Sequence, residues 1–233
     1  VTISIRGVLT VLLPGTGSDE DYLERAFGGP IGEAGGILHA VAPEPDGLVA
    51  GYLRALHAAA RDGPIAVGGV SLGAAVAARW ALAHPRDTVA VLAALPAWTG
   101  PPGDAPAAAS ALHTAAALRR DGLATTTAAM RTSSPAWLGD ELARSWRRQW
   151  PALPDAMEEA AAYVAPTRAE LGQIHTPMAV VAATDDPIHP TGVAAEWVSA
   201  APRAALRAVS LAEFGPRPAT LGAACLAALA GID

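Results

Sequence analysis

The sequence has little of several features that mark out particular classes of protein. Its 233 residues include one cysteine, Cys225, which excludes a disulfide within the chain and any zinc site built from cysteines. A lone cysteine of this kind is typical of a small buried hydrophobe. Lysine and arginine number 16 against 22 acidic residues and are scattered, so we do not expect the concentrated basic face that binds nucleic acid.

Long hydrophobic runs are also missing. The uncharged segment from Thr88 to Gly103 is interrupted by prolines, and the one from Pro218 to Ile232 has 15 residues, fewer than the roughly 20 that cross a membrane. The chain begins VTISIR, which lacks the basic, apolar and small-residue order of a signal peptide. We therefore expect a cytoplasmic protein without a membrane partner, for which small uncharged molecules are the open class of ligand.

The composition, 52% hydrophobic and 16% charged, suits one well-packed globular domain. Short apolar runs alternate with helix-like stretches, which predicts an α/β fold with a mostly parallel sheet covered by helices on both faces. Each run is continuous rather than alternating in polarity, so all are expected to be central strands. The expected strands are Gly7 to Leu13, Gly36 to Val41, Pro64 to Val70, Thr88 to Leu95, Pro177 to Ala183 and Ala204 to Leu211. The expected helices are Asp19 to Phe27, Asp46 to Arg61, Leu72 to His84, Thr191 to Ala200 and Ala219 to Ala230.

One stretch, Ala97 to Gln173, contains no convincing strand and starts with a turn rich in proline and glycine. We interpret residues 97–173 as an inserted cap of several short helices, with residues 1–96 and 174–233 forming the core domain. Tryptophans in it would either line a substrate pocket or, as we favour, pack the cap onto the core; they are Trp98, Trp137, Trp146 and Trp150. Two arginines near the end of one cap helix, Arg147 and Arg148, are expected on a solvated face.

The residues that predict chemistry are Gly69-Val70-Ser71-Leu72-Gly73. They directly follow an apolar strand and directly precede a helix of small residues, which is the context of the G-x-S-x-G nucleophile elbow. Glycine is needed on both flanks because a sharp turn from strand to helix leaves no room for side chains there. Ser71 is therefore the candidate nucleophile, against the alternative of a chance glycine–serine turn.

A second element follows the first strand, in the segment LPGTGS from Leu13 to Ser18. Glycine keeps this loop open, so we expect the backbone N–H groups of Thr16 and Leu72 to form an oxyanion hole. The alternative is an ordinary loop between a strand and a helix. Ser18 is expected to cap the next helix, with Asp21 three residues on. The acidic residues Asp19 to Asp21 would repel an anionic acyl group, which favours a neutral ester as substrate.

A third element, the segment TDDPIHP from Thr184 to Pro190, ends a later strand at the same sheet edge as Ser71. The order of elbow serine, helical insertion and aspartate after a strand resembles the α/β-hydrolase superfamily, over essentially the whole chain. The resemblance implies an α/β-hydrolase fold with serine-hydrolase chemistry. In that family the acid lies in a small-x-x-Asp-Pro pattern, which implies Asp186, with Asp185 as the second choice.

The sequence departs from the family pattern at the general base. The family places its histidine after the final strand, usually after a glycine, whereas this chain has EFGPRP at 213–218 and no histidine beyond His189. His189 lies on the same loop as Asp186, at the correct sheet edge, and is the candidate base. The alternative is that His189 only helps to close the turn before the next helix. The other histidines are expected on a strand, on helices, in the cap or at the wrong end of a strand; they are His39, His57, His84, His113 and His175.

Together these residues predict a serine hydrolase that acts on a small, largely apolar ester or thioester. No cofactor and no metal are expected, because no cluster of His, Asp and Glu has the spacing of metal ligands. The alternative is a noncatalytic ligand-binding or interaction protein that has lost its catalytic histidine. A third hypothesis is acyl transfer to an acceptor other than water.

Overall fold

The computed structural model describes residues 3–44 and 47–232 and has one six-stranded parallel sheet in the order β2-β1-β3-β4-β5-β6. The strands are β1 (Leu9–Leu13), β2 (Ile37–Ala40), β3 (Ile65–Val70), β4 (Thr88–Ala94), β5 (Met178–Ala183) and β6 (Ala204–Val209). The helices are α1 (Glu20–Glu33), α2 (Leu48–Ala59), α3 (Leu72–Ala83), α4 (Pro106–Ser133), α5 (Ala136–Gln149), α6 (Leu153–Ala161), α7 (Arg168–Leu171), α8 (Thr191–Ala200), α9 (Leu211–Phe214) and α10 (Ala219–Ala230), with a 3₁₀ turn at Ala60–Asp62.

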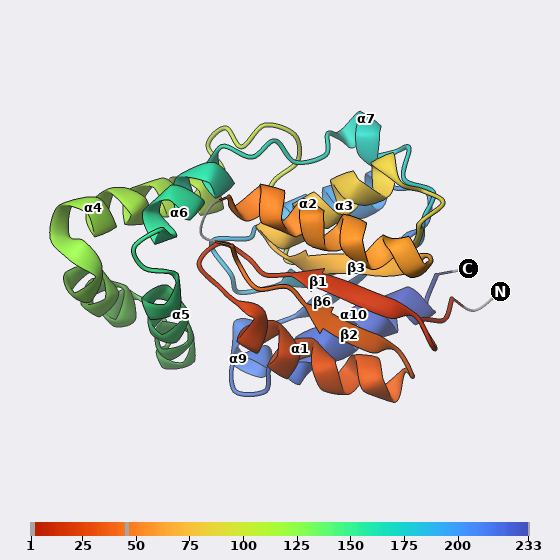
Figure 1. Ribbon diagram of the computed structural model, residues 1–233, viewed down its shortest axis with the longest axis horizontal. Helices are drawn as coiled ribbons and strands as arrows, with labels where there is room; N and C mark the ends of the chain where they lie inside the picture. Colours follow the sequence, from red (N-terminus) through yellow and green to blue (C-terminus); the bar gives the residue numbers. More distant parts are fainter. Residues whose placement is uncertain (1–2, 45–46, 233) are drawn as a thin grey trace.

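Helices cover both faces of the sheet, and each face has its own apolar core. In Figure 1, α1 and α10 lie below the sheet and α2 and α3 above it. The core under α1 and α10 includes Phe27 and Leu221, and the core under α2, α3 and α8 includes Tyr52 and Trp197. The chain changes face because β2 and β3 lie on opposite sides of β1 and parallel crossovers are right-handed. The predicted fold class is confirmed.

The expectation that every strand is central is wrong at the two ends of the sheet. In β2 the side chains of Ile37 and His39 are exposed, and in β6 those of Leu206, Arg207 and Ala208 are exposed. Both are edge strands. A short apolar run looks the same in sequence whether it lies at the centre or at the edge of a sheet.

The start of α1 also differs from the expectation. Its N-cap is Asp19 rather than Ser18, and the Asp19 carboxylate accepts a hydrogen bond from the backbone N–H of Tyr22. The helix continues six residues past the expected end at Phe27, with Pro30 inside it and its last residue at Glu33.

The segment between β4 and β5 forms α4 to α7. Helices α4, α5 and α6 extend beyond one end of the sheet (Figure 1). The segment holds several helices, as expected, and the 28-residue α4 consists of two helical stretches that meet at a kink at Gly122, whose φ is 78°. Glu159 of α6 accepts hydrogen bonds from the N–H groups of Leu48 and Val49, at 2.8 and 3.1 Å, and so caps the first turn of α2 from a distant part of the chain.

Candidate active site

Ser71 lies at the turn between β3 and α3. Its backbone has φ 55° and ψ −115°, a conformation that residues other than glycine rarely adopt and that costs about 1–3 kcal/mol. Glycine flanks it because the turn is tightly packed. A Cβ on Gly69 would lie 2.8 Å from the carbonyl carbon of Gly73, and a Cβ on Gly73 would lie 2.9 Å from the carbonyl oxygen of Pro14. The sharp turn presents Ser71 at the carboxyl end of the sheet, as the sequence predicts.

The loop after β1 lies against this turn. A Cβ on Gly15 would lie 3.4 Å from the Cβ of Ser71. Residues 15–18 form a four-residue turn in which the Ser18 N–H donates to the Gly15 carbonyl at 3.0 Å, and Gly17 has the positive φ of 72° that the third position of a type II turn requires. Among the described residues, neither the Thr16 nor the Leu72 amide has a hydrogen-bond acceptor. Both amides are therefore free to donate to a ligand.

Asp186 and His189 reach Ser71 from the loop after β5. The Nε2 atom of His189 lies 3.0 Å from the Oγ of Ser71, and its Nδ1 lies 2.6 Å from the Oδ2 of Asp186. The other carboxylate oxygen of Asp186 accepts hydrogen bonds from the backbone N–H groups of Ile188 and His189, at 2.8 and 3.3 Å. These bonds curl the loop, so that a histidine three residues from its acid can also face a serine 118 positions away in the sequence.

The surroundings of Asp186 favour its ionised form. Burial alone raises the pKa of Asp186, but hydrogen bonds from the His189 ring and the two backbone amides, together with the charge of His189, outweigh burial and leave the pKa below its usual value. A carboxylate at this position holds a proton on Nδ1 of His189. The Nε2 atom then has a free lone pair for the Ser71 hydroxyl.

Asp185 and the other histidines lie elsewhere. The Asp185 carboxylate accepts a hydrogen bond from the Leu211 N–H at 2.6 Å, so it links the loop to α9 rather than to His189. His57 and His84 pack beside Trp80, with the His84 ring stacked on the indole at 4.6 Å between centroids. The side chains of His39, His113 and His175 are exposed.

The inserted helices pack over the loop after β1. Trp146 of α5 is buried, and a Cβ on Gly17 would lie 2.8 Å from its Nε1 and 3.3 Å from the Cε of Met157. Together with Ala115, Leu118 and Leu153 these two side chains form a small apolar cluster. The four tryptophans differ: Trp98 is buried in the core, Trp137 packs edge-on against Phe214, and Trp150 is 40% exposed. Trp146 is the one that packs against Gly17, in the loop that carries Thr16.

Arginines of α5 pair with the acidic residues at the start of α1. Arg147 and Arg148 are exposed, as expected, and Arg148 also pairs with Asp19, Glu20 and Asp21. Arg144 donates to both oxygens of the Asp19 carboxylate, at 2.6 and 2.7 Å. Arg144 and Arg148 offset part of the charge of the three acidic residues, so the repulsion of an anionic acyl group is weaker than the sequence alone suggests.

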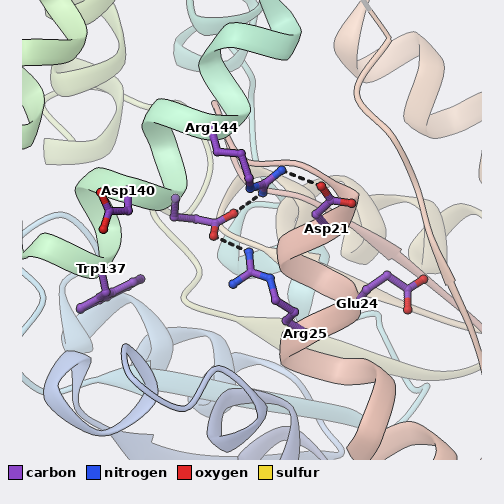
Figure 2. Close-up of a pocket in the computed structure, with 7 residues that line it drawn as sticks. Asp21, Glu24, Arg25, Trp137, Asp140 and Arg144 are labelled. Atoms are coloured by element: carbon purple, nitrogen blue, oxygen red, sulfur yellow. Dashed lines mark hydrogen bonds and ion pairs between the residues drawn. The ribbon is translucent and has the colours of Figure 1, made fainter.

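A surface recess lies between α1 and α5, beside these ion pairs (Figure 2). Its lining includes Arg25 and Arg144, which both donate to the buried carboxylate of Glu141. The recess does not include Ser71 or His189. Within it Asp21, Arg144, Glu141 and Arg25 form a continuous row of ion pairs that joins α1 to α5, so we regard the recess as part of the contact between α5 and the core.

Three further sequence expectations concern a metal site, a membrane-spanning helix and the cysteine. In the described ranges, 3–44 and 47–232, no group of three or more His, Cys, Asp and Glu side chains is arranged to hold a metal ion. Within the same ranges, no helix is both long enough and apolar enough to cross a membrane. Cys225 is fully buried, and burial raises its thiol pKa to about 12, which makes it an unreactive core residue.

The parallel sheet with helices on both faces and the strained turn at Ser71 define an α/β hydrolase. The family model described as serine aminopeptidase, S33 matches residues 48–214, well over half of the chain, so the chain belongs to that family. The matched region contains Ser71, Asp186 and His189 but not the loop of Thr16. A comparison with curated proteins gives no match.

Solved structures with the same fold include several hydrolases and a peroxidase. The putative non-heme bromoperoxidase BpoC from Mycobacterium tuberculosis H37Rv is 18% identical, with a TM-score of 0.69 over 96% of this chain and 92% of that chain. MGS-M2, an α/β hydrolase from a Medee basin deep-sea metagenome library, is 16% identical, with a TM-score of 0.71 over 97% and 90%. The enol-lactonase from Burkholderia xenovorans LB400 is 17% identical, with a TM-score of 0.63 over 88% and 83%. At these identities the likeness shows the fold alone.

Proposed function

We propose that the protein is a serine hydrolase that cleaves small, largely apolar esters or thioesters through an acyl-enzyme on Ser71. One observation carries the proposal: the hydrogen-bonded chain from Ser71 Oγ to His189 Nε2, at 3.0 Å, and from His189 Nδ1 to Asp186, at 2.6 Å. A nucleophile bound to a base that is itself oriented by an acid is the arrangement that activates a serine.

In the proposed reaction His189 takes the proton of the Ser71 hydroxyl as the Oγ attacks the ester carbonyl. The amides of Thr16 and Leu72 donate to the oxyanion of the tetrahedral intermediate, and Asp186 stabilises the imidazolium. His189 then protonates the leaving alcohol or thiol as the carbonyl–leaving-group bond breaks. Water, deprotonated by His189, then attacks the acyl-enzyme. The bond between the acyl carbon and Ser71 Oγ breaks, His189 returns the proton to Oγ, and the carboxylic acid leaves.

The inserted helices support the preference for an apolar acyl group. We propose that residues 97–173 form a cap whose apolar cluster of Trp146, Met157, Leu153 and Leu118 faces the loop beside Ser71. Ser71 itself is only 8% exposed, which favours small substrates over large ones. The four side chains of this cluster are at most 3% exposed, so the proposal requires the cap to open before a carbon chain packs against them. Each CH₂ group that is then buried would contribute about 0.8 kcal/mol.

Covalent labelling by a fluorophosphonate, read by intact mass, tests the proposal without a known substrate. The wild type should gain one adduct within minutes, and Ser71→Ala none. His189→Ala should label at least about 1,000-fold more slowly, because the serine then lacks its base. His113→Ala is the matched control, since His113 is exposed on α4, and it should label like the wild type.

Each outcome points to a different conclusion. If the wild type is not labelled over hours, the proposal is refuted and the noncatalytic alternative is favoured, in which the protein binds a ligand and has no working general base. Labelling of His189→Ala at the wild-type rate would leave Ser71 as nucleophile but remove His189 from the mechanism. With labelling established, a series of nitrophenyl esters of increasing chain length would test the apolar preference.

A further inference from the structure

A buried tyrosine of α2 reaches the loop that carries Thr16. The hydroxyl of Tyr52 donates a hydrogen bond to the carbonyl oxygen of Pro14 at 3.2 Å, across 38 positions of sequence. Tyr52 is fully buried in the core between the sheet and α2. Burial, followed by the charges of Glu159 and Glu20, raises the pKa of Tyr52 well above its usual value. The hydroxyl therefore keeps its proton, and with it the ability to donate.

The carbonyl groups of residues near Thr16 accept hydrogen bonds, whereas the Thr16 N–H donates none within the described part of the chain. The Pro14 carbonyl accepts from Tyr52, the Gly15 carbonyl from Ser18 at 3.0 Å, and the Ser18 carbonyl from the Gln149 side chain at 3.0 Å. The Gly15 carbonyl and the Thr16 N–H belong to one peptide group, so fixing the carbonyl on one side aims the N–H to the other.

The bond from Tyr52 acts on the peptide group immediately before this one. Gly15 joins the two groups, and glycine permits a wide range of backbone angles, so it does not itself restrict the rotation of one group relative to the other. An external anchor on the first group therefore matters more here than it would beside a bulkier residue. Because a Cβ on Gly15 would touch Ser71, any such rotation occurs next to the nucleophile.

We infer that Tyr52 is a positioning residue that fixes the Pro14–Gly15 peptide group and so aims the Thr16 N–H at the oxyanion formed on Ser71. The inference rests on the proposed function, because it needs an oxyanion on Ser71. It predicts that the Tyr52 hydroxyl contributes to stabilising the transition state rather than to binding the substrate in its ground state. A purely structural tyrosine would instead affect folding alone.

The test is Tyr52→Phe, which removes the hydroxyl and keeps the ring. With 4-nitrophenyl butyrate as substrate, and active sites counted by fluorophosphonate labelling, kcat should fall by about 10-fold while KM changes less than about twofold, since the loss of a whole oxyanion donor costs roughly 100-fold or more. Binding of a trifluoromethyl ketone, which forms a tetrahedral oxyanion on the serine, should weaken by the same factor. The shape of the pH–rate profile should stay the same, because His189 and Asp186 are untouched.

The matched control is Tyr22→Phe, a buried tyrosine in the core on the other face of the sheet, which should keep the kcat of the wild type. An unchanged kcat for Tyr52→Phe, or a loss confined to KM, would overturn the inference while leaving the proposed function intact. A loss equal in both tyrosine variants would also overturn it, as a general effect of removing a buried hydroxyl. If the wild type neither labels nor turns over substrate, the proposed function fails first and the inference falls with it.

Discussion

Gly73→Ala is expected to damage both the fold and the site, although alanine normally favours a helix. Gly73 is the second residue of α3, where alanine would ordinarily gain up to about 1 kcal/mol over glycine. Here the added Cβ would lie 2.6 Å from the carbonyl carbon of Leu13, closer still to its oxygen, and 2.9 Å from the carbonyl oxygen of Pro14. These atoms are all backbone, so no side-chain rotation relieves the clash.

The size of the effect follows from the overlap. Carbon atoms in contact lie about 3.5–4.0 Å apart, so β1 and α3 would have to separate by roughly 1 Å. Overpacking of this kind costs about 1–3 kcal/mol, and the upper end applies where only backbone can move. For a chain of this length a loss of about 3 kcal/mol lowers the Tm by about 6–12 °C. The displaced atoms begin the loop of Thr16, so labelling of Ser71 should also slow.

Thermal and urea unfolding followed by circular dichroism, together with fluorophosphonate labelling, would measure both effects. Gly32→Ala is the matched control, because Gly32 is exposed within α1, is not followed by proline, and a Cβ there meets nothing within 4 Å. This control should be stabilised by about 0.5–1 kcal/mol. The reasoning would be refuted if Gly73→Ala unfolded within about 0.5 kcal/mol of the wild type, the range of a neutral surface substitution.

Three further predictions concern acid stability and the contacts between the insertion and the core. Folding lowers the pKa of Asp186, so the ionised carboxylate stabilises the fold at pH values above its usual pKa. This contribution is lost as the pH falls through the lowered pKa. Asp186→Asn should therefore reduce the free energy of unfolding more at pH 7 than at pH 2 in urea titrations. Arg144→Gln leaves the Asp19 carboxylate, which is 2% exposed, with only the longer pair to Arg148 and should lower the free energy of unfolding by about 2–3 kcal/mol. Arg131→Gln, which breaks an exposed pair with Asp140, is the control and should lower it by less than about 1 kcal/mol in the same assay. Glu159→Gln removes the charge that caps α2 and should lower the free energy of unfolding by about 0.5–1 kcal/mol in urea titrations. Because salt screens charges, this difference from the wild type should be smaller at high salt, and a difference that does not change with salt would contradict the electrostatic explanation.

Much of the core of this protein was predictable from sequence because its signals are local. A continuous apolar run followed by G-x-S-x-G describes a strand, a strained turn and a helix, and each depends on residues within a few positions of one another. The structure accordingly has β3, Ser71 and α3 where the pattern predicts them. The carboxyl ends of parallel strands meet at one sheet edge, so the segments that carry Thr16 and Asp186 were also predictable as neighbours of Ser71.

Contacts between distant segments were decided by the tertiary structure. The sequences of the edge strands β2 and β6 predicted central strands, because the residues of a strand do not show which elements lie beside it. Arg144 had no signal in sequence, since its partner Asp19 lies 125 positions away, and Tyr52 had none either.

His189 combines the two cases. Its place on the loop of Asp186 followed from sequence alone, whereas the direction of its ring did not. That direction depends on two backbone N–H groups that bind the Asp186 carboxylate and curl the loop until the imidazole lies 3.0 Å from Ser71. The sequence shows which groups can donate or accept hydrogen bonds, whereas the tertiary structure determines which of them lie close enough to form one.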